Sequence, residues 1–164
     1  MIILGFDPGL ATLGYGVIEK GSAFKPQMID YGIISTPKEE NLPVRLCMLE
    51  EGVKQVIAKF HPNELAVEEL FFAKNVTTGI NVAHARGVLL LTAVKECGRL
   101  YEYTPLQIKQ ALTGYGKADK HQIQAMVKSY LNLRSIPRPD DAADALAVAL
   151  CHAQTNKLGK LFSI

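Results

Sequence analysis

The chain has 164 residues, of which 48% are hydrophobic and 21% charged, and its formal net charge is +2. This length and composition predict one globular domain whose core needs neither disulfides nor structural metal, and three widely spaced cysteines without a C-x-x-C pair favour reduced thiols in a cytosol. The N-terminal apolar run is short, lacks a basic flank and is broken by an acid, so neither a signal peptide nor a membrane span is expected.

The first twenty residues, MIILGFDPGLATLGYGVIEK, predict a β-hairpin with a carboxylate at its mouth. Residues 2–6 and 13–18 have the apolar pattern of strands, and Pro8 and Gly9 supply turn chemistry after Asp7. An ionised carboxylate is too costly to bury alone, so Asp7 must be solvated, hydrogen-bonded or bound to a cation. Two interpretations stay open at this point, a turn cap and a functional acid.

Residues 27–35 predict a third strand. The connections between the first three strands are too short for a helical crossover, so these strands should form an antiparallel meander. Residues 42–60 carry apolar side chains at helical spacing and predict an amphipathic helix that ends before Pro62.

The next segment, ELAVEEL at residues 64–70, accepts charge only at its ends and predicts a central parallel strand. Glu68 and Glu69 lie at its carboxyl end, where ligands collect in parallel sheets. Successive strand residues point to opposite faces, so only one of the two can share a face with Asp7, and the pattern leaves open which. The alternative is a surface glutamate pair at a strand exit.

Residues 75–97 predict a long helix that is apolar around much of its circumference, so we expect one of its sides to face a second subunit. Residues 100–103 predict a short strand, and residues 105–112 and 118–131 predict two helices on either side of a glycine-containing turn. Asp119 is a candidate cap of the second helix. The turn lacks the spacing of a phosphate-binding P-loop.

The stretch PRPDDAADALAVALCHA, residues 137–153, predicts a helix with Asp140 as its N-cap. Asp141 and Asp144 are three residues apart and share one helix face, and Asp140 and Asp144 are also close enough to meet. Favourable charges near a helix N-terminus account for Asp140 and are an alternative for Asp141. They account poorly for Asp144, which lies among alanines and leucine and therefore needs a partner or a metal ion.

Charge is unevenly distributed along the chain. Residues 1–104 carry ten Lys and Arg against twelve Asp and Glu, whereas residues 105–164 carry eight against four. A basic surface beside an acidic site suits a polyanionic substrate handled through metal ions, and a merely solvated basic face is the alternative. The basic residues are Lys109, Lys117, Lys120, Lys128, Arg134, Arg138, Lys157 and Lys160.

Dispersed carboxylates without a thiolate or a histidine pair at ligand spacing favour Mg²⁺ or Mn²⁺ over zinc. Four acids brought together repel one another unless cations neutralise them. Two ions about 3.5–4 Å apart are the usual solution in phosphodiester cleavage, where one activates water and the other stabilises the leaving oxygen.

With these acids, the order of predicted elements resembles the ribonuclease-H-like nuclease superfamily. The segments GFDPGLATLGYGVI, AVEELFFAKN, ARGV, IKQALTGYGKADKHQIQ and DDAADALAVALCH are similar to the RuvC family of Holliday-junction resolvases, over about residues 2–155. The resemblance implies an α/β fold with a mixed five-stranded sheet, its first three strands antiparallel, flanked by helices. It also implies one nuclease domain over residues 1–164, with a short tail from about 156.

By position, the resemblance places the catalytic and metal-binding acids at Asp7, Glu68, Asp141 and Asp144. It thereby sets aside the neighbours of two of these acids, Glu69 and Asp140. Phe71 matches an aromatic residue that stacks on bases at the opened crossover, and Phe72 would widen that wedge. The predicted DNA contacts are Phe71, Phe72, Lys109, Lys117 and Lys120, with Lys117 a local addition. The glycines beside Asp7 would keep side chains away from ions and the scissile phosphate.

The resemblance implies two Mg²⁺ ions per site, with Mn²⁺ able to substitute, and a cytoplasmic homodimer joined through the helix from Asn75. Its substrate would be branched DNA, a four-way junction nicked near the crossover to leave 5′-phosphate and 3′-hydroxyl ends, and its partner a branch-migration helicase complex. Three rivals are a sugar-kinase or actin-like ATPase, which needs two such domains, a catalytically silent junction-binding protein and a nuclease for structured RNA. The four acids argue against the silent form.

Overall fold

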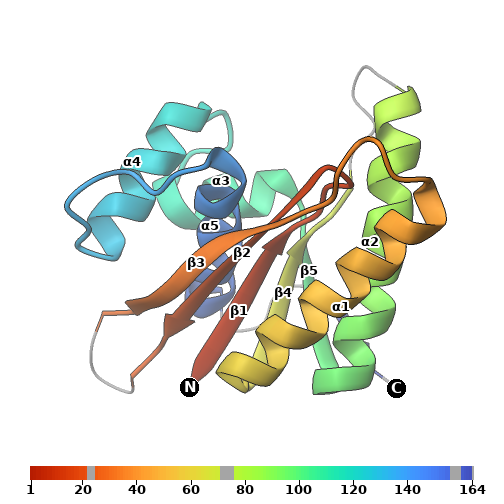
Figure 1. The fold of residues 1–164 in the computed structure, drawn as a ribbon. Helices are drawn as coiled ribbons and strands as arrows, with labels where there is room; N and C mark the ends of the chain where they lie inside the picture. Colours follow the sequence, from red (N-terminus) through yellow and green to blue (C-terminus); the bar gives the residue numbers. More distant parts are fainter. Residues whose placement is uncertain (22–24, 71–75, 156–159, 164) are drawn as a thin grey trace.

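A mixed β-sheet forms the centre of the protein, with helices on both faces (Figure 1). The computed structural model describes residues 1–21, 25–70, 76–155 and 160–163. The strands are β1 (Ile2–Asp7), β2 (Thr12–Glu19), β3 (Gln27–Ser35), β4 (Glu64–Glu68), β5 (Arg99–Tyr103) and β6 (Lys160–Ser163). The helices are α1 (Leu42–Phe60), α2 (Val76–Cys97), α3 (Pro105–Thr113), α4 (Lys120–Tyr130) and α5 (Asp140–Gln154).

The strand order is β3-β2-β1-β4-β5-β6. Strands β1, β2 and β3 pair antiparallel, and β4 and β5 then add in parallel to β1, so the predicted five-stranded mixed sheet is confirmed. The short tail predicted from about residue 156 contains a further strand that the sequence pattern did not indicate. Residues 160–163 form the sixth strand, β6, which pairs antiparallel with β5.

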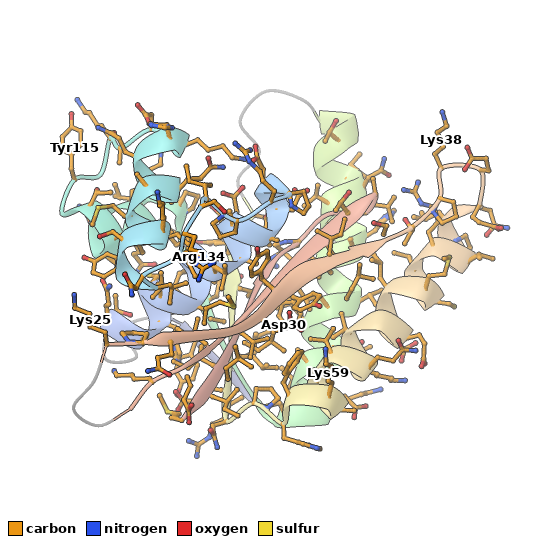
Figure 2. All side chains as sticks on the ribbon, turned by 60° about the vertical axis from the view of Figure 1, so that its left-hand side comes forward. Lys25, Asp30, Lys38, Lys59, Tyr115 and Arg134 are labelled. Atoms are coloured by element: carbon orange, nitrogen blue, oxygen red, sulfur yellow. The ribbon has the colours of Figure 1, made fainter. Side chains whose placement is uncertain are left out.

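Two helical layers cover the sheet. Helices α1 and α2 lie together on one face, and α5 lies on the other face with α3 and α4 outside it (Figure 1). On the first face, Lys59 of α1 reaches Asp30 of β3, with 3.0 Å between Nζ and Oδ2 (Figure 2). No helix in the part of the chain that the structure describes is long and apolar enough to cross a bilayer.

Local capping sets where α4 and α5 begin. Asp119 caps α4 as predicted, since its carboxylate accepts from the backbone amide of Gln122 at 2.8 Å and its own backbone amide donates to Oε1 of Gln122 at 2.9 Å. The prediction that Asp140 caps α5 is wrong. Pro139 holds the N-cap position and has no side chain that could cap, so Asp140 is the first residue of the helix.

Small residues on one face of the hairpin let α5 lie directly on the sheet. A Cβ atom at Gly5 would lie 2.3 Å from the carbonyl oxygen of Ala145, and one at Gly16 would lie 2.7 Å from the Leu146 amide nitrogen. At Gly14 the distance to the carbonyl oxygen of Asp141 would be 2.0 Å. Backbone atoms cannot yield at such distances, so glycine is required for α5 to approach β1 and β2.

Candidate active site

Asp7 and Glu68 are neighbours at the carboxyl edge of the sheet. Phe6 of β1 pairs with Val67 of β4, so the next residue of each strand lies beside the other. A Cβ at Gly5, two residues before Asp7, would meet the backbone of α5, so strand alternation directs the Asp7 side chain to the α5 face as well. The prediction that a strand-end glutamate neighbours Asp7 is confirmed.

Strand alternation identifies which glutamate this is. Ala66 is buried in the core cluster that contains α5, so Glu68 points to that same face. Glu69 points to the α2 side, where burial lowers the pKa of Arg86 and the charge of Glu69 opposes part of this effect. Its amide donates to the carbonyl oxygen of Tyr103 at 2.8 Å. Glu68 is therefore the glutamate that faces the other acids.

Helix α5 brings Asp141 and Asp144 to the same edge. The carbonyl group of Asp141 lies against Gly14, which pairs with Asp7 in the hairpin register. Gly14 therefore has a role that its sequence pattern did not indicate. Because it has no side chain, the first turn of α5 can pack directly against β2. One helical turn later, Asp144 lines the same cavity as Glu68.

The electrostatics confirm that the four acids are close together. Burial and then the charges of Glu68, Asp144 and Asp141 raise the pKa of Asp7 well above its usual range. Burial, followed by repulsion from Asp144, raises the pKa of Glu68 to about 7. Burial also raises the pKa of Asp144, against the opposing effect of Lys120. Asp7 therefore lies among carboxylates that repel it, and its role as a functional acid stays a prediction.

Two cavities meet at Glu68. One of about 230 Å³ is lined by Glu68, Lys109, Lys120 and Asp144 together with apolar side chains. The other, of about 240 Å³, is lined by Asp7, Pro8, Glu68, Glu69 and Arg86 among others. The acids thus lie between two openings, with lysines in the first and an arginine in the second.

The predicted DNA-contacting lysines have different placements. Lys109 of α3 is close to Glu68. Burial raises the pKa of Glu68, and the charge of Lys109 opposes part of that rise. Lys120 of α4 contacts Asp144, with 2.9 Å between Nζ and Oδ2. Lys117 is exposed in the turn between α3 and α4. Phe71 and Phe72 lie outside the described residues.

The donor set fits a hard cation. Its ligand atoms would all be carboxylate oxygens, which Mg²⁺ and Mn²⁺ prefer, and the ammonium of Lys120 already lies where positive charge is favoured. Among the described residues, no three His, Cys, Asp or Glu side chains converge closely enough to hold a metal ion. The carboxylates of Glu68, Asp144 and Asp141 are nonetheless near enough to Asp7 to raise its pKa.

Sequence reasoning missed a buried ion pair beside the site. Arg86 of α2 contacts Glu102 of β5, whose side chain is only 6% exposed. The available signal was Glu102, a charge between the buried Tyr101 and Tyr103 of a short strand. The pair ties α2 to the sheet directly behind the cavity that contains Asp7.

Comparisons with known proteins extend over nearly the whole chain. A family model described as crossover junction endodeoxyribonuclease RuvC matches residues 3–152. The protein of that name from Clostridioides difficile (strain 630) is 53% identical over 161 residues, covering 98% of this chain and 94% of the relative. The one from Petrotoga mobilis is 56% identical over 153 residues, covering 93% of each.

Solved structures give the same result. The chain matches Thermus thermophilus RuvC in complex with a Holliday junction substrate at a TM-score of 0.91 and 35% identity, covering 99% of both chains. The yeast mitochondrial Holliday junction resolvase shares the fold at a TM-score of 0.67 and 16% identity, covering 93% of this chain and 77% of that one. The expected ribonuclease-H-like fold is confirmed, and the chain belongs to the RuvC family of crossover junction endodeoxyribonucleases.

Proposed function

We propose that this protein resolves four-way DNA junctions as a metal-dependent endonuclease and acts as one nuclease domain over residues 1–164. Its catalytic and metal-binding acids are Asp7, Glu68, Asp141 and Asp144. One observation carries this assignment. In a member of the RuvC family, the half-buried Asp7 carboxylate lies beside Glu68 at the strand ends and is repelled by Glu68, Asp144 and Asp141, an arrangement that costs free energy until a cation compensates it.

Two Mg²⁺ ions per site, for which Mn²⁺ can substitute, would be held by these acids. When bound, the metal supplies Lewis-acid activation of water and stabilisation of the leaving oxygen. The chain itself provides the oxygen ligands from β1, β4 and α5. Lys109 and Lys120 flank these ligands and attract the phosphate of the strand to be cut. The expected products are 5′-phosphate and 3′-hydroxyl ends, which a ligase can reseal.

The DNA contacts extend beyond the acids. Lys117, exposed close to Lys120, is suited to a further phosphate contact. Phe71 and Phe72 follow Glu68 and Glu69 along the chain, and an aromatic that stacks on unpaired bases contributes about 1–3 kcal/mol per base whatever the sequence. Junction specificity in this proposal comes from stacking and phosphate contacts, with no need for reading base edges.

The working form is a homodimer in the cytoplasm, in which each subunit nicks one of two strands of like polarity. Ile80 and Leu91 support a partner on the outer face of α2, since their side chains are 48% and 58% exposed. The family resemblance adds a branch-migration helicase complex as a further partner.

The decisive experiment is cleavage of a synthetic mobile four-way junction in Mg²⁺ by the Asp7→Asn variant. We expect cleavage to be abolished and structure-selective binding to be kept, because Asn preserves size and removes the ligand charge. Asp30→Asn is the matched control, since Asp30 pairs with Lys59 on the opposite face of the sheet, and its cleavage should equal that of the wild type. Undiminished cleavage by Asp7→Asn would refute the metal-site assignment.

The same assay separates the rival functions. A duplex and an RNA–DNA hybrid, tested beside the junction, should be cut far more slowly. Preferential cleavage of structured RNA or of the hybrid would support an RNA nuclease instead. ATP binding in a calorimeter would support the ATPase rival.

A further inference from the structure

The ion pair between Lys120 and Asp144 occupies one of the two carboxylate oxygens of a proposed metal ligand. Nζ of Lys120 lies 2.9 Å from Oδ2 of Asp144. A metal ion on this carboxylate and an ammonium in direct contact with it would repel each other strongly at such short range. Lys120 therefore competes with a metal ion for the negative charge of Asp144.

A second carboxylate is already in reach of the same ammonium. Oδ2 of Asp140 lies 3.5 Å from Nζ of Lys120. Asp140 precedes Asp144 by one turn of α5, so both aspartates face α4 on the same side of the helix. Lys120 can pass from one to the other by a change of side-chain rotamer, without movement of either helix.

The orientation of Asp140 is fixed by two further contacts. Its other oxygen, Oδ1, accepts from Nε2 of Gln124 at 3.2 Å and from the guanidinium of Arg138. Gln124 is only 5% exposed and lies one turn after Lys120 on α4. Because these donors occupy Oδ1, the oxygen directed at Lys120 is Oδ2. Asp140 is therefore a preformed acceptor, although it is neither the helix cap nor one of the four proposed ligands.

We propose that Asp140 is a positioning residue that takes over Lys120 when a metal ion binds Asp144. The proposal rests on the function given above, in which Asp144 is a metal ligand. Asp140 keeps the ammonium at the edge of the site, where it contacts the DNA phosphate. Without Asp140, the only described carboxylate that the ammonium contacts is Asp144, so Lys120 competes with the metal. Asp140 thus favours metal binding by removing an internal competitor.

Metal binding by the whole chain, without DNA, tests this inference. Mn²⁺ titrated in a calorimeter should bind Asp140→Asn about two- to tenfold more weakly than the wild type, at the lower end of the range for coupled neighbours. Asn keeps an oxygen acceptor for Gln124, and an unchanged thermal midpoint would show that α5 is intact. Lys120→Met should bind Mn²⁺ more tightly than the wild type, because the competing ammonium is absent.

The double variant separates positioning from simple charge. If Asp140 acts through Lys120, then Asp140→Asn has less than about a twofold effect on Mn²⁺ affinity in the Lys120→Met background. If it acts as a distant negative charge, the two backgrounds show equal losses, and the proposal is wrong. Unchanged affinity of Asp140→Asn in the wild-type background would also overturn it.

Cleavage supplies a second readout. With Asp140→Asn, the Mg²⁺ concentration for half-maximal junction cleavage should rise by the same two- to tenfold factor, while the rate at saturating Mg²⁺ stays close to that of the wild type. A lower maximal rate with an unchanged Mg²⁺ requirement would contradict the proposal. Failure of the proposed function gives a different result, in which wild type and Asp7→Asn bind Mn²⁺ equally.

Discussion

Nε2 of His152 lies 2.8 Å from Oε2 of Glu64, and both side chains are buried beneath the active-site edge. Nδ1 of the same ring lies 2.6 Å from the hydroxyl of Tyr103. A neutral imidazole with its proton on Nε2 satisfies both bonds, because it donates to Glu64 and accepts from Tyr103. The network joins α5 to β4 and β5. These hydrogen bonds therefore help to fix the position of α5 along the sheet, and with it the position of Asp144, two turns earlier on α5, relative to the strand ends.

Tyr103→Phe should lower the free energy of unfolding by about 1–3 kcal/mol, because it removes one partner from a buried polar network. Urea denaturation at neutral pH measures this change. Tyr115→Phe is the matched control, since Tyr115 is 55% exposed, and its effect should stay within about 0.5 kcal/mol. Equal small effects of the two variants would mean that the network makes no net contribution.

The metal-free protein should lose stability as the pH rises from about 5 to 8. The pKa of Glu68 is raised from 4.5 to about 7, so the unfolded chain gives up this proton at lower pH than the folded protein does. The folded state therefore binds more protons than the unfolded state between pH 4.5 and about pH 7, and the free energy of unfolding falls as the pH rises through this range. The raised pKa values of Asp7 and Asp144 act in the same direction. Mg²⁺ should restore more stability at pH 8 than at pH 5.

Urea denaturation in the presence of a chelator, at pH 5 and pH 8, measures this slope. Glu68→Gln cannot lose a proton, so the variant should gain stability over the wild type at pH 8 and show a flatter dependence on pH. The exposed Glu39 offers a control, because Glu39→Gln should leave the slope unchanged. Identical slopes for wild type and Glu68→Gln would show that Glu68 titrates normally.

Most of the fold follows from local patterns in the sequence. The hairpin, the amphipathic helix at residues 42–60 and the parallel strand after it have strong periodicity, and the structure has them at nearly the predicted bounds. Strand β6 was not predicted, because a four-residue segment carries little pattern and depends on its pairing with β5. The cap of α5 was misassigned because the sequence offered Asp140, a good capping residue, next to Pro139.

The site was harder to predict, because the sequence at a strand end does not show to which face of the sheet each side chain points. Alternation allowed either Glu68 or Glu69 until the family resemblance favoured the first. One signal was available: Gly5 and Ala66 are the small residues on which an alanine-rich helix can pack, and Asp7 and Glu68 each follow one of them by two positions. The pairing of Lys120 with Asp140 had no comparable signal, since it depends on how α4 packs against α5.

Gly14→Ala should disrupt the proposed active site, because Gly14 of β2 lies directly against the first turn of α5. The added Cβ would lie 2.0 Å from the carbonyl oxygen of Asp141, so the first turn of α5 must move away from β2. Overpacking of this kind costs about 1–3 kcal/mol or more, and the shift should also impair junction cleavage. Gly87→Ala is the control, because a Cβ there meets nothing within 4 Å and alanine favours the helix by about 1 kcal/mol. Urea denaturation and junction cleavage measure both variants.

Leu91→Asp should convert the proposed homodimer to a monomer without unfolding it. The side chain of Leu91 is 58% exposed in the isolated subunit, so an aspartate there is tolerated by the monomer. In an apolar interface the same carboxylate would be buried without a partner. The free energy that this burial costs is far larger than the binding free energy that one leucine contributes. Sedimentation velocity measures the change, and circular dichroism checks that α2 remains folded.

Leu106→Asp provides the matched control for this prediction, since Leu106 is 53% exposed but lies on α3, away from α2. It should sediment as the wild type does. The monomeric Leu91→Asp variant should retain the acids of each active site but lose the paired nicking of two strands, so cleaved junctions should carry single nicks. If Leu91→Asp sediments with the wild type while Leu106→Asp dissociates, then the subunit interface includes α3, and the outer face of α2 is left for another partner.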